Sequence, residues 1–295
     1  RYFRERDAGV ARPWPKGFVE LGLGEQAFYE AFRSYDDIVE RLRELVAHSR
    51  GAAELVPLSK RTWEGREIYS VRLRGADWKP GMPRAVFTYL LHAREWITAM
   101  SGVYSVDRAI EMALADASFL AGLEVVFVPV SNPDGLVYSA SRERYWRKNR
   151  RPYPGCDGVD LNRNFDFQWL NGFEPSSSRA QPPASLQCQE VYSGPTAASE
   201  PETKALQSLL REAPVAVSID FHSCGGYILG PWSYTKEPHP RAAEIDELGG
   251  WLHMAIESVH GTDYHFCTGN RCLYPVPGNL ADFGSSTGAL GFTVE

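Results

Sequence analysis

The chain has 295 residues, of which 43% are hydrophobic and 23% charged, so it can bury a sizeable core and extensive disorder is not expected. Its net charge of −6 argues against nucleic acid as a main partner, because phosphate binding needs a basic face. No apolar run approaches the ~18 residues of a membrane-spanning helix, and the opening RYFRER lacks the apolar middle of a signal peptide. We therefore expect no membrane insertion, and a protein that is either cytosolic or has lost a leader.

The first half of the chain predicts a tail followed by helices and strands. Residues 1–26 are rich in Arg, Gly and Pro and show no period, so we expect an N-terminal tail or the remnant of a removed segment. Over 35–48 apolar residues recur at helical spacing, with Ser34 as the cap. Further elements expected here are strands over 54–59, 67–73, 85–91 and 123–130, a helix after the third strand to about residue 112, and a turn at 132–135.

The second half combines a long irregular stretch with further helices and strands. Residues 139–195 contain no convincing long element, and such stretches are commonly functional. Helices alternating with strands predict an α/β fold: a single domain over 27–295 with a central mixed, mainly parallel sheet flanked by helices. The elements expected after the irregular stretch are helices over 198–211 and 240–259 and strands over 215–221, 227–230 and 291–295.

Polar residues that follow buried strands are candidate ligands, because α/β sheets bind ligands beyond the carboxyl ends of their strands. His92 and Glu95 follow the apolar run 85–91 and lie one helical turn apart, and His222 follows another strand. Taken singly, the first pair could be a solvated helix start and the lone His a hydrogen-bonded residue. Together they supply two imidazoles and a carboxylate, the ligand set of a catalytic zinc site with water in the fourth place.

A cationic stretch is the third candidate feature. Arg144, Arg147 and Lys148 are followed by the segment 158–165 (GVDLNRNF), which contains Arg163. In isolation this is as well explained by a solvated basic loop. Arg, however, can grip a carboxylate with its planar fork of donors. Beside a metal, such arginines indicate that an anion or a developing oxyanion is held there.

Several short motifs, taken in order along the chain, resemble those of a known family. It resembles the zinc metallocarboxypeptidases of the pancreatic carboxypeptidase A and B type, from about residue 27 to the end. Any one match is modest, but all of them in the family's order are very specific. The matching segments are 92–98 (HAREWIT), 132–135 (NPDG), 144–148 (RYWRK), 158–165, 192–194 with 199–201 (YSG and SEP), His222-Ser223, Tyr274 and 292–295 (FTVE).

The resemblance implies a role for each matching residue. One zinc ion would be bound by His92, Glu95 and His222, with Asp160 accepting a hydrogen bond from His92. Glu295 would be the general base, and Arg147 would polarise the scissile carbonyl. The substrate-binding residues would be Asn162 and Arg163 on the terminal carboxylate, Tyr274 closing over it, Arg94 guiding the peptide, and Ala281 at the floor of the side-chain pocket.

The five cysteines bear on the compartment of the protein. An odd number leaves at least one thiol unpaired, and five reduced cysteines in a cytosolic enzyme is one interpretation. We favour a disulfide between Cys156 and Cys188, which the resemblance also implies, and hence a secreted protein. Cys224 is left as a free thiol or a partner of Cys267 or Cys272.

The expected activity is removal of one C-terminal residue from peptides. Because Ala281 carries no charge, we expect an apolar or aromatic preference. The alternatives are a catalytically silent module that binds C-terminal tails and a zinc amidase that acts on non-peptide acyl groups. A monomer is favoured. Since the chain stops on Glu295, where the family continues, we also expect the native protein to extend further.

Overall fold

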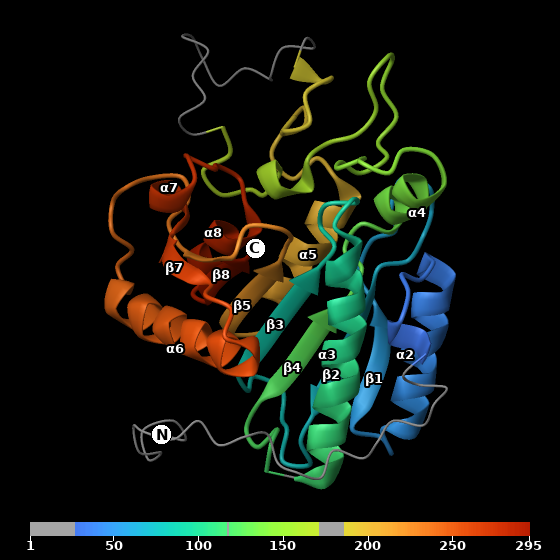
Figure 1. The fold of residues 1–295 in the computed structure, drawn as a ribbon, viewed down its shortest axis with the longest axis vertical. Helices are drawn as coiled ribbons and strands as arrows, with labels where there is room; N and C mark the ends of the chain where they lie inside the picture. Colours follow the sequence, from blue (N-terminus) through green and yellow to red (C-terminus); the bar gives the residue numbers. More distant parts are fainter. Residues whose placement is uncertain (1–26, 117, 171–185) are drawn as a thin grey trace.

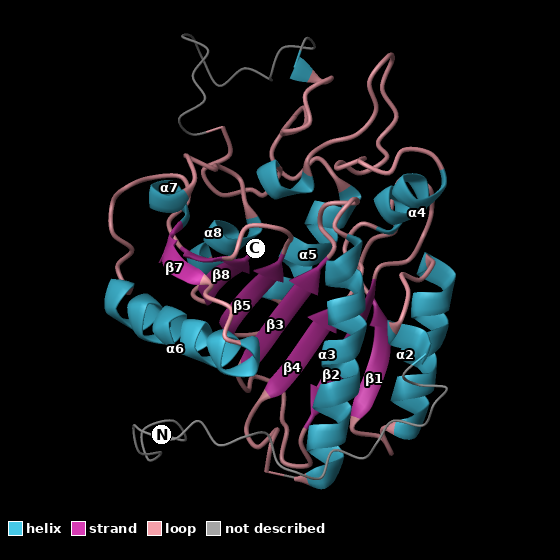
Figure 2. Ribbon diagram, viewed as in Figure 1, coloured by secondary structure: helices cyan, strands magenta, loops and turns pink. Residues whose placement is uncertain are grey.

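One eight-stranded sheet organises the molecule (Figures 1 and 2). The computed structural model describes residues 27–116, 118–170 and 186–295. The strand order is β1-β2-β4-β3-β5-β8-β6-β7, with parallel pairing from β4 through β3 and β5 to β8 and between β6 and β7. The predicted mixed, mainly parallel α/β sheet is confirmed. The strands are β1 (Ala53–Pro57), β2 (Tyr69–Arg74), β3 (Arg84–Tyr89), β4 (Glu124–Val128), β5 (Val215–Phe221), β6 (Tyr227–Gly230), β7 (His265–Thr268) and β8 (Leu290–Val294).

Helices cover both faces of this sheet (Figure 2). Because side chains alternate along a strand, Val125 and Phe127 of β4 enter the core on one face, and Val126 and Val128 enter the core on the other. A strand buried on both faces reads as an unbroken apolar run, as 123–130 does. The first face carries α2 (Tyr35–His48), α3 (Trp96–Ala115) and α6 (Ala242–His260), and the second carries α5 (Pro201–Arg211) and α8 (Leu280–Ser286). Within the described ranges, no helix combines the length and apolar character that a membrane crossing requires.

Local signals explain where the predictions succeed and fail. The helix over 35–48 is confirmed, and Ser34 and Asp37 form its capping box. The turn expected at 132–135 is wrong, because α4 (Pro133–Ser141) begins there. Asn132 accepts a hydrogen bond from the Gly135 amide as the cap, and proline is well suited to the first helical position. The short elements β7, α7 (Gly269–Cys272), α8 and the 3₁₀ turn Leu161–Arg163 were not predicted.

Three neighbouring parallel strands end at the same edge of the sheet. Tyr89 of β3 lies beside Phe221 of β5, which lies beside Val294 of β8. The residues that follow these strands therefore emerge side by side. The His222 amide bonds the Val294 carbonyl at 2.7 Å, so the segment after β5 stays paired to β8. The topology thus brings residues more than a hundred positions apart to one place.

A buried polar cluster anchors the irregular stretch above this edge. Asn149 Nδ2 donates to Glu200 at 2.8 Å and to Glu202 at 3.0 Å, both at the start of α5. The Asn149 amide and side-chain oxygen also bond the backbone of Val159. Arg151 pairs with Glu200 at 2.8 Å. The segment just before Asn149 is held against the domain by this cluster rather than by regular secondary structure.

This cluster predicts a pH dependence of stability. Burial, with Glu200 and Asp134 nearby, raises the pKa of Glu202 to about 8 despite the hydrogen bond from Asn149. In the unfolded chain the same carboxyl titrates near ~4.3. Between these values the folded protein keeps a proton that the unfolded chain has lost. The contribution of Glu202 to stability is therefore fully present below the lower value, falls by about 1.4 kcal/mol per pH unit between the two values, and is lost above about pH 8.

We expect Glu202→Gln to remove that slope, because the amide keeps the shape and does not titrate. The free energy of unfolding would be measured by denaturant titration at intervals from pH 5 to 8. Glu247→Gln on the exposed side of α6 is the control and should keep the wild-type slope. A Glu202→Gln protein that loses stability with rising pH as steeply as wild type would contradict the assignment.

Candidate active site

Two imidazoles and one carboxylate converge beyond the carboxyl ends of β3 and β5. His92 Nδ1 lies 3.0 Å from Glu95 Oε1 and 3.0 Å from His222 Nδ1, and His222 Nδ1 lies 3.0 Å from Glu95 Oε2. All three side chains are buried. Two imidazole nitrogens and a carboxylate at one point are the donors of a catalytic zinc site, so the residues present fit that ion.

The position of Glu95 is set by the start of α3. Glu95 occupies the residue before the helix, yet its side chain caps no helical amide. Thr98 Oγ1 bonds the Glu95 carbonyl at 2.8 Å and holds this corner instead. The carboxylate is thereby free to face the two histidines. A missing local cap at a buried position is typical of a residue retained for function.

Two further carboxylates orient the imidazoles from behind. His92 Nε2 lies 3.1 Å from Asp160 Oδ1, and His222 Nε2 lies 2.6 Å from Asp220 Oδ2. Because a carboxylate accepts, each Nε2 donates and each Nδ1 keeps its lone pair toward the centre. Asp160 had been expected in this position, whereas Asp220 had no role assigned. Its signal was spacing, since residues two apart on a strand point to the same side.

Charge at the centre is balanced between these groups. Burial alone would raise the pKa of the Glu95 carboxyl, but His92 and His222 outweigh it and hold the pKa below its usual range. Burial opposes a charge on His222, yet Asp220 and Glu95 raise its pKa well above the usual value. The carboxylates therefore favour positive charge where the imidazoles meet. A metal cation supplies such a charge.

Arg147 lies beside the same centre. Its Nε and Nη2 lie 3.1 Å and 3.0 Å from Asp160 Oδ2. Burial would raise the pKa of Asp160, but Arg147 and His92 lower it well below its usual range. The Arg147 side chain is thus held by a charged partner, and Arg147 also lines the cavity.

Arg163 provides a second cationic group near the site. Arg163 Nη2 donates to the Tyr274 hydroxyl at 3.2 Å, and Arg163 Nη1 bonds the Asn162 carbonyl at 2.8 Å. Asn162 Oδ1 accepts a hydrogen bond from the Leu280 amide at 2.9 Å, and Asn162 Nδ2 lies 3.3 Å from His222 Nε2. These contacts place Asn162, Arg163 and Tyr274 together.

One cavity of about 180 Å³ joins these groups. Glu295 lines it from the end of β8, and its backbone pairs with Tyr227 at 2.8 Å. Arg94 reaches the cavity from the other side and donates to Glu190 at 3.0 Å. The residues expected at the site that line the cavity are His92, Arg94, Glu95, Arg147, Asn162, Arg163, Tyr274 and Glu295.

Comparison with known families decides the assignment. The family model for zinc carboxypeptidases matches residues 38–295. The chain belongs to the zinc carboxypeptidase family. Membership implies a zinc cofactor, and the group formed by His92, Glu95 and His222 has the donors to bind it.

Relatives span most of the chain. A metallocarboxypeptidase A-like protein of Trichophyton verrucosum is 32% identical over 282 residues, 92% of this chain and 64% of that protein. Human carboxypeptidase A1 is 30% identical over 274 residues, 90% of this chain and 62% of that protein. The chain thus spans less than two thirds of the length of these curated relatives.

Solved structures share the fold. The structure of carboxypeptidase A from Helicoverpa armigera superposes with a TM-score of 0.79 at 28% identity, covering 90% of this chain and 65% of that one. Bovine thrombin-activatable fibrinolysis inhibitor, solved with a tick carboxypeptidase inhibitor, gives a TM-score of 0.79 at 26% identity, covering 91% of this chain and 87% of that one.

The inner wall of the cavity differs from the sequence-based expectation. Ala281 is buried in α8 and is not among the lining residues, so its role as the pocket floor has no support here. The wall is built by residues of several short segments. They are Leu229, Ser233, Gly269, Leu273, Val276, Asn279 and Thr293.

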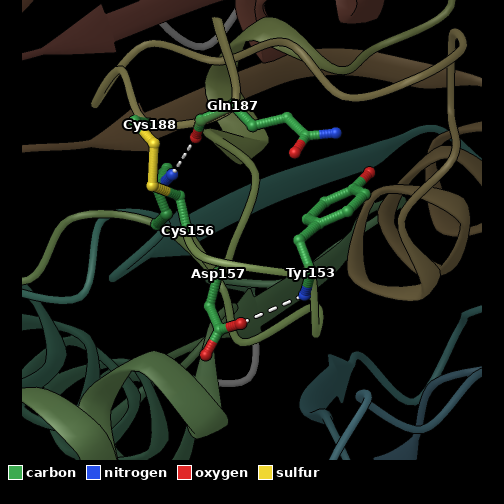
Figure 3. Close-up of a disulfide and its surroundings, with 6 residues drawn as sticks. Tyr153, Cys156, Asp157, Gln187 and Cys188 are labelled. Atoms are coloured by element: carbon green, nitrogen blue, oxygen red, sulfur yellow. Dashed lines mark hydrogen bonds between the residues drawn. A yellow bond between two sulfur atoms is a disulfide. The ribbon is translucent and has the colours of Figure 1, made fainter. Parts of the chain in front are cut away.

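Two disulfides flank the site. Cys156 and Cys188 are joined, as the family resemblance implies (Figure 3), and Asp157 beside them accepts a hydrogen bond from the Tyr153 amide at 3.0 Å. Cys267 and Cys272 are also joined, and Cys224 is a free thiol. His265 lies close enough to Cys267 and Cys272 to form a candidate metal-ligand group with them, but the two cysteine sulfurs are bonded to each other.

The carboxylate behind His222 gives a prediction about metal affinity. We expect Asp220→Asn to weaken zinc binding by about 10- to 100-fold, because the imidazole loses its charged acceptor. Affinity would be measured by competition with a chromogenic chelator. Asp246→Asn, exposed on α6, is the control and should bind as wild type does. Equal affinity in a folded Asp220→Asn protein would show that Asp220 does not orient His222.

Proposed function

We propose that the protein is a zinc-dependent carboxypeptidase that hydrolyses the last peptide bond and releases one C-terminal amino acid. One observation carries the proposal. A single cavity is lined by two members of the zinc ligand group, by Glu295 and by two separate arginines, Arg147 and Arg163. His222, the third member, lies within 3.0 Å of the other two. A peptide terminus has a carboxylate and a scissile carbonyl a few ångströms apart, and this arrangement offers a cation for each.

Each residue then has a distinct task. Bound zinc would polarise the carbonyl and make water acidic enough to lose a proton near neutral pH. The Glu295 carboxylate would accept a proton from the attacking water and deliver it to the leaving amine. Arg147, fixed by Asp160, stabilises negative charge that develops on the carbonyl oxygen. One zinc ion would be held by His92, Glu95 and His222, the three protein ligands that a catalytic zinc site uses.

Selectivity for chain ends follows from the second arginine. Arg163 and the Tyr274 hydroxyl meet at 3.2 Å, and Asn162 sits beside them. A free α-carboxylate can accept from all three, whereas an internal peptide bond offers no charge there. Arg94 is placed to contact the peptide on the other side of the metal group and would first have to share its bond to Glu190.

An apolar or aromatic C-terminal side chain suits the inner wall. Leu229, Leu273 and Val276 contribute apolar surface, and among the described residues of this wall none is charged. A basic or acidic side chain would be desolvated there without a partner, which is costly. Preference for an apolar end is therefore supported by the wall itself and not by Ala281.

The setting of the enzyme follows from the remaining features. Two disulfides favour an oxidising compartment, hence secretion. Peptide and protein C-termini are the partners, with no nucleic acid and no membrane insertion, and the catalytic domain is residues 27–295 of a monomer. The silent-module alternative is disfavoured because the ligands and Glu295 are all present. The amidase alternative is disfavoured because Arg163 and Tyr274, which would hold the terminal carboxylate of a peptide, are present.

The catalytic assignment is tested at Glu295. We expect Glu295→Gln in the full-length protein to lower kcat by about 10²- to 10⁴-fold, the usual contribution of a general base. Zinc content should stay at wild-type level, because Glu295 is not in the ligand group. Turnover would be followed as release of free amino acid from blocked dipeptides ending in Phe, Leu, Lys or Glu. A wild-type protein that binds zinc and cleaves none of them would refute the proposed activity.

The role of Arg163 is tested with paired substrates. We expect Arg163→Ala to raise KM for a blocked dipeptide with a free C-terminus by about 10- to 100-fold, since a charge-assisted contact is lost. The dipeptide with an amidated C-terminus should be a poor substrate for both proteins, and Arg163→Ala should raise its KM little further. If Arg163→Ala weakened both substrates equally, the arginine would not be reading the carboxylate.

A further inference from the structure

The Cys267–Cys272 disulfide closes a small loop at the edge of the sheet. Cys267 lies in β7, which pairs only with β6 among the described strands, and Cys272 ends α7. The two Cα atoms are 6.3 Å apart, and five positions separate the cysteines in the chain. This covalent link therefore constrains one short segment rather than joining distant parts of the fold.

That segment forms part of the wall of the substrate cavity. Gly269 lies inside the closed loop, and Leu273 and Tyr274 follow it directly; all three line the cavity. Gly269 packs so closely on Ser233, another wall residue, that a Cβ there would collide with the Ser233 hydroxyl. The position of α7 therefore helps to define the inner shape of the pocket.

Few hydrogen bonds connect α7 to the rest of the fold, although Gly269 and Asn270 are buried. α7 is a single turn without a side-chain cap, and the Leu273 amide bonds the Gly269 carbonyl at 3.0 Å. Asn270 reaches Trp232 and Ser233 through two long bonds of 3.4 Å each. Isolated helical turns are unstable, and ordering each residue costs about 1–2 kcal/mol.

The residues that follow α7 add little packing of their own. Leu273 is 42% exposed and Tyr274 is 52% exposed. The hydrogen bond from Arg163 to the Tyr274 hydroxyl, at 3.2 Å, and that from the Val276 amide to the Ser233 carbonyl, at 2.8 Å, tie the segment only at its far end. At the near end, Cys267 and Thr268 pair with β6, and the disulfide links that strand to the last residue of α7.

We propose that the Cys267–Cys272 disulfide is a positioning element of the substrate pocket, which orders the wall formed by Gly269, Leu273 and Tyr274 before the peptide binds. The inference rests on the proposed function and deepens it. Pre-ordering a wall removes an entropic cost from binding and leaves the chemistry at the zinc group untouched. Loss of the bond should therefore weaken binding of large C-terminal side chains more than it slows turnover.

The test uses the full-length protein and a Cys267→Ser/Cys272→Ser double variant. We expect KM for a blocked dipeptide ending in Phe to rise by about tenfold, as ordering costs of this size predict. The kcat value should stay within about twofold and zinc content should be unchanged. For a dipeptide ending in Gly the rise in KM should be smaller, because no side chain meets the wall. Asp246→Ser/Glu247→Ser on the exposed side of α6 is the matched control and should match wild type.

A chemical version keeps the test decisive if the double variant fails to fold. A water-soluble phosphine reduces the disulfide of the folded wild-type protein: phosphorus is oxidised to the phosphine oxide with oxygen from water, the S–S bond breaks, and each sulfur gains a proton. Thiol labelling and peptide mapping would identify protein reduced at Cys267 and Cys272 but not at Cys156 and Cys188. Unchanged KM for the Phe substrate in that protein would overturn the proposal.

A binding measurement separates this inference from the proposed activity. Calorimetry on the slow Glu295→Gln protein would give the Kd of a Phe-ending peptide with the disulfide intact and with it removed by the double substitution or by reduction. If wild type does not cleave the peptide, the catalytic proposal fails, and a weaker Kd on loss of the bond still supports the positioning role. If the Glu295→Gln protein binds no such peptide, or if Kd is the same with and without the bond, the positioning role is refuted.

Discussion

The interaction on which the site depends is the meeting of His92 and His222 inside a set of buried carboxylates. Glu95 faces both Nδ1 atoms, while Asp160 and Asp220 face the two Nε2 atoms. Negative charge at this depth is stable only with compensating cations, since breaking a buried pair leaves a charge without a partner. Arg147 compensates Asp160 from one side. A metal ion between the imidazoles would compensate from the centre, so the ligands, their carboxylates and the arginine form one electrostatic unit.

Sheet topology makes that unit possible. His92, His222 and Glu295 follow β3, β5 and β8, which are adjacent and parallel, so their side chains reach one edge without long loops. Arg147, Asn162 and Arg163 come from the irregular stretch 139–195, which lies mostly outside helices and strands. Asn149 fixes that stretch through Glu200 and Glu202. Rigid strands therefore position the metal group, and a buried polar cluster positions the arginine that works beside it.

Sequence could predict the elements whose signals are local and periodic. The strand over 215–221 and the helix over 35–48 were found because hydrophobic period and cap residues agree with the final packing. The short elements α7 and α8 escaped, because four to seven residues show no period. Asp220 had no role assigned, although its two-residue spacing to His222 was a signal in the sequence. The Cys267–Cys272 pairing was left open, since cysteine counting does not give connectivity.

The residues proposed for the chemistry and those proposed for side-chain recognition come from different kinds of segment. The three proposed zinc ligands are buried, mutually bonded and placed just beyond strand ends, which suits a reaction that tolerates little misplacement. The inner wall of the cavity instead comprises single residues from β6, α7, β8 and the turns between them. Most of these wall residues are buried, whereas Leu273, directly after α7, is 42% exposed. A covalent link within the weakest of these segments is then the simplest way to keep a pocket shaped without rebuilding the core beneath it.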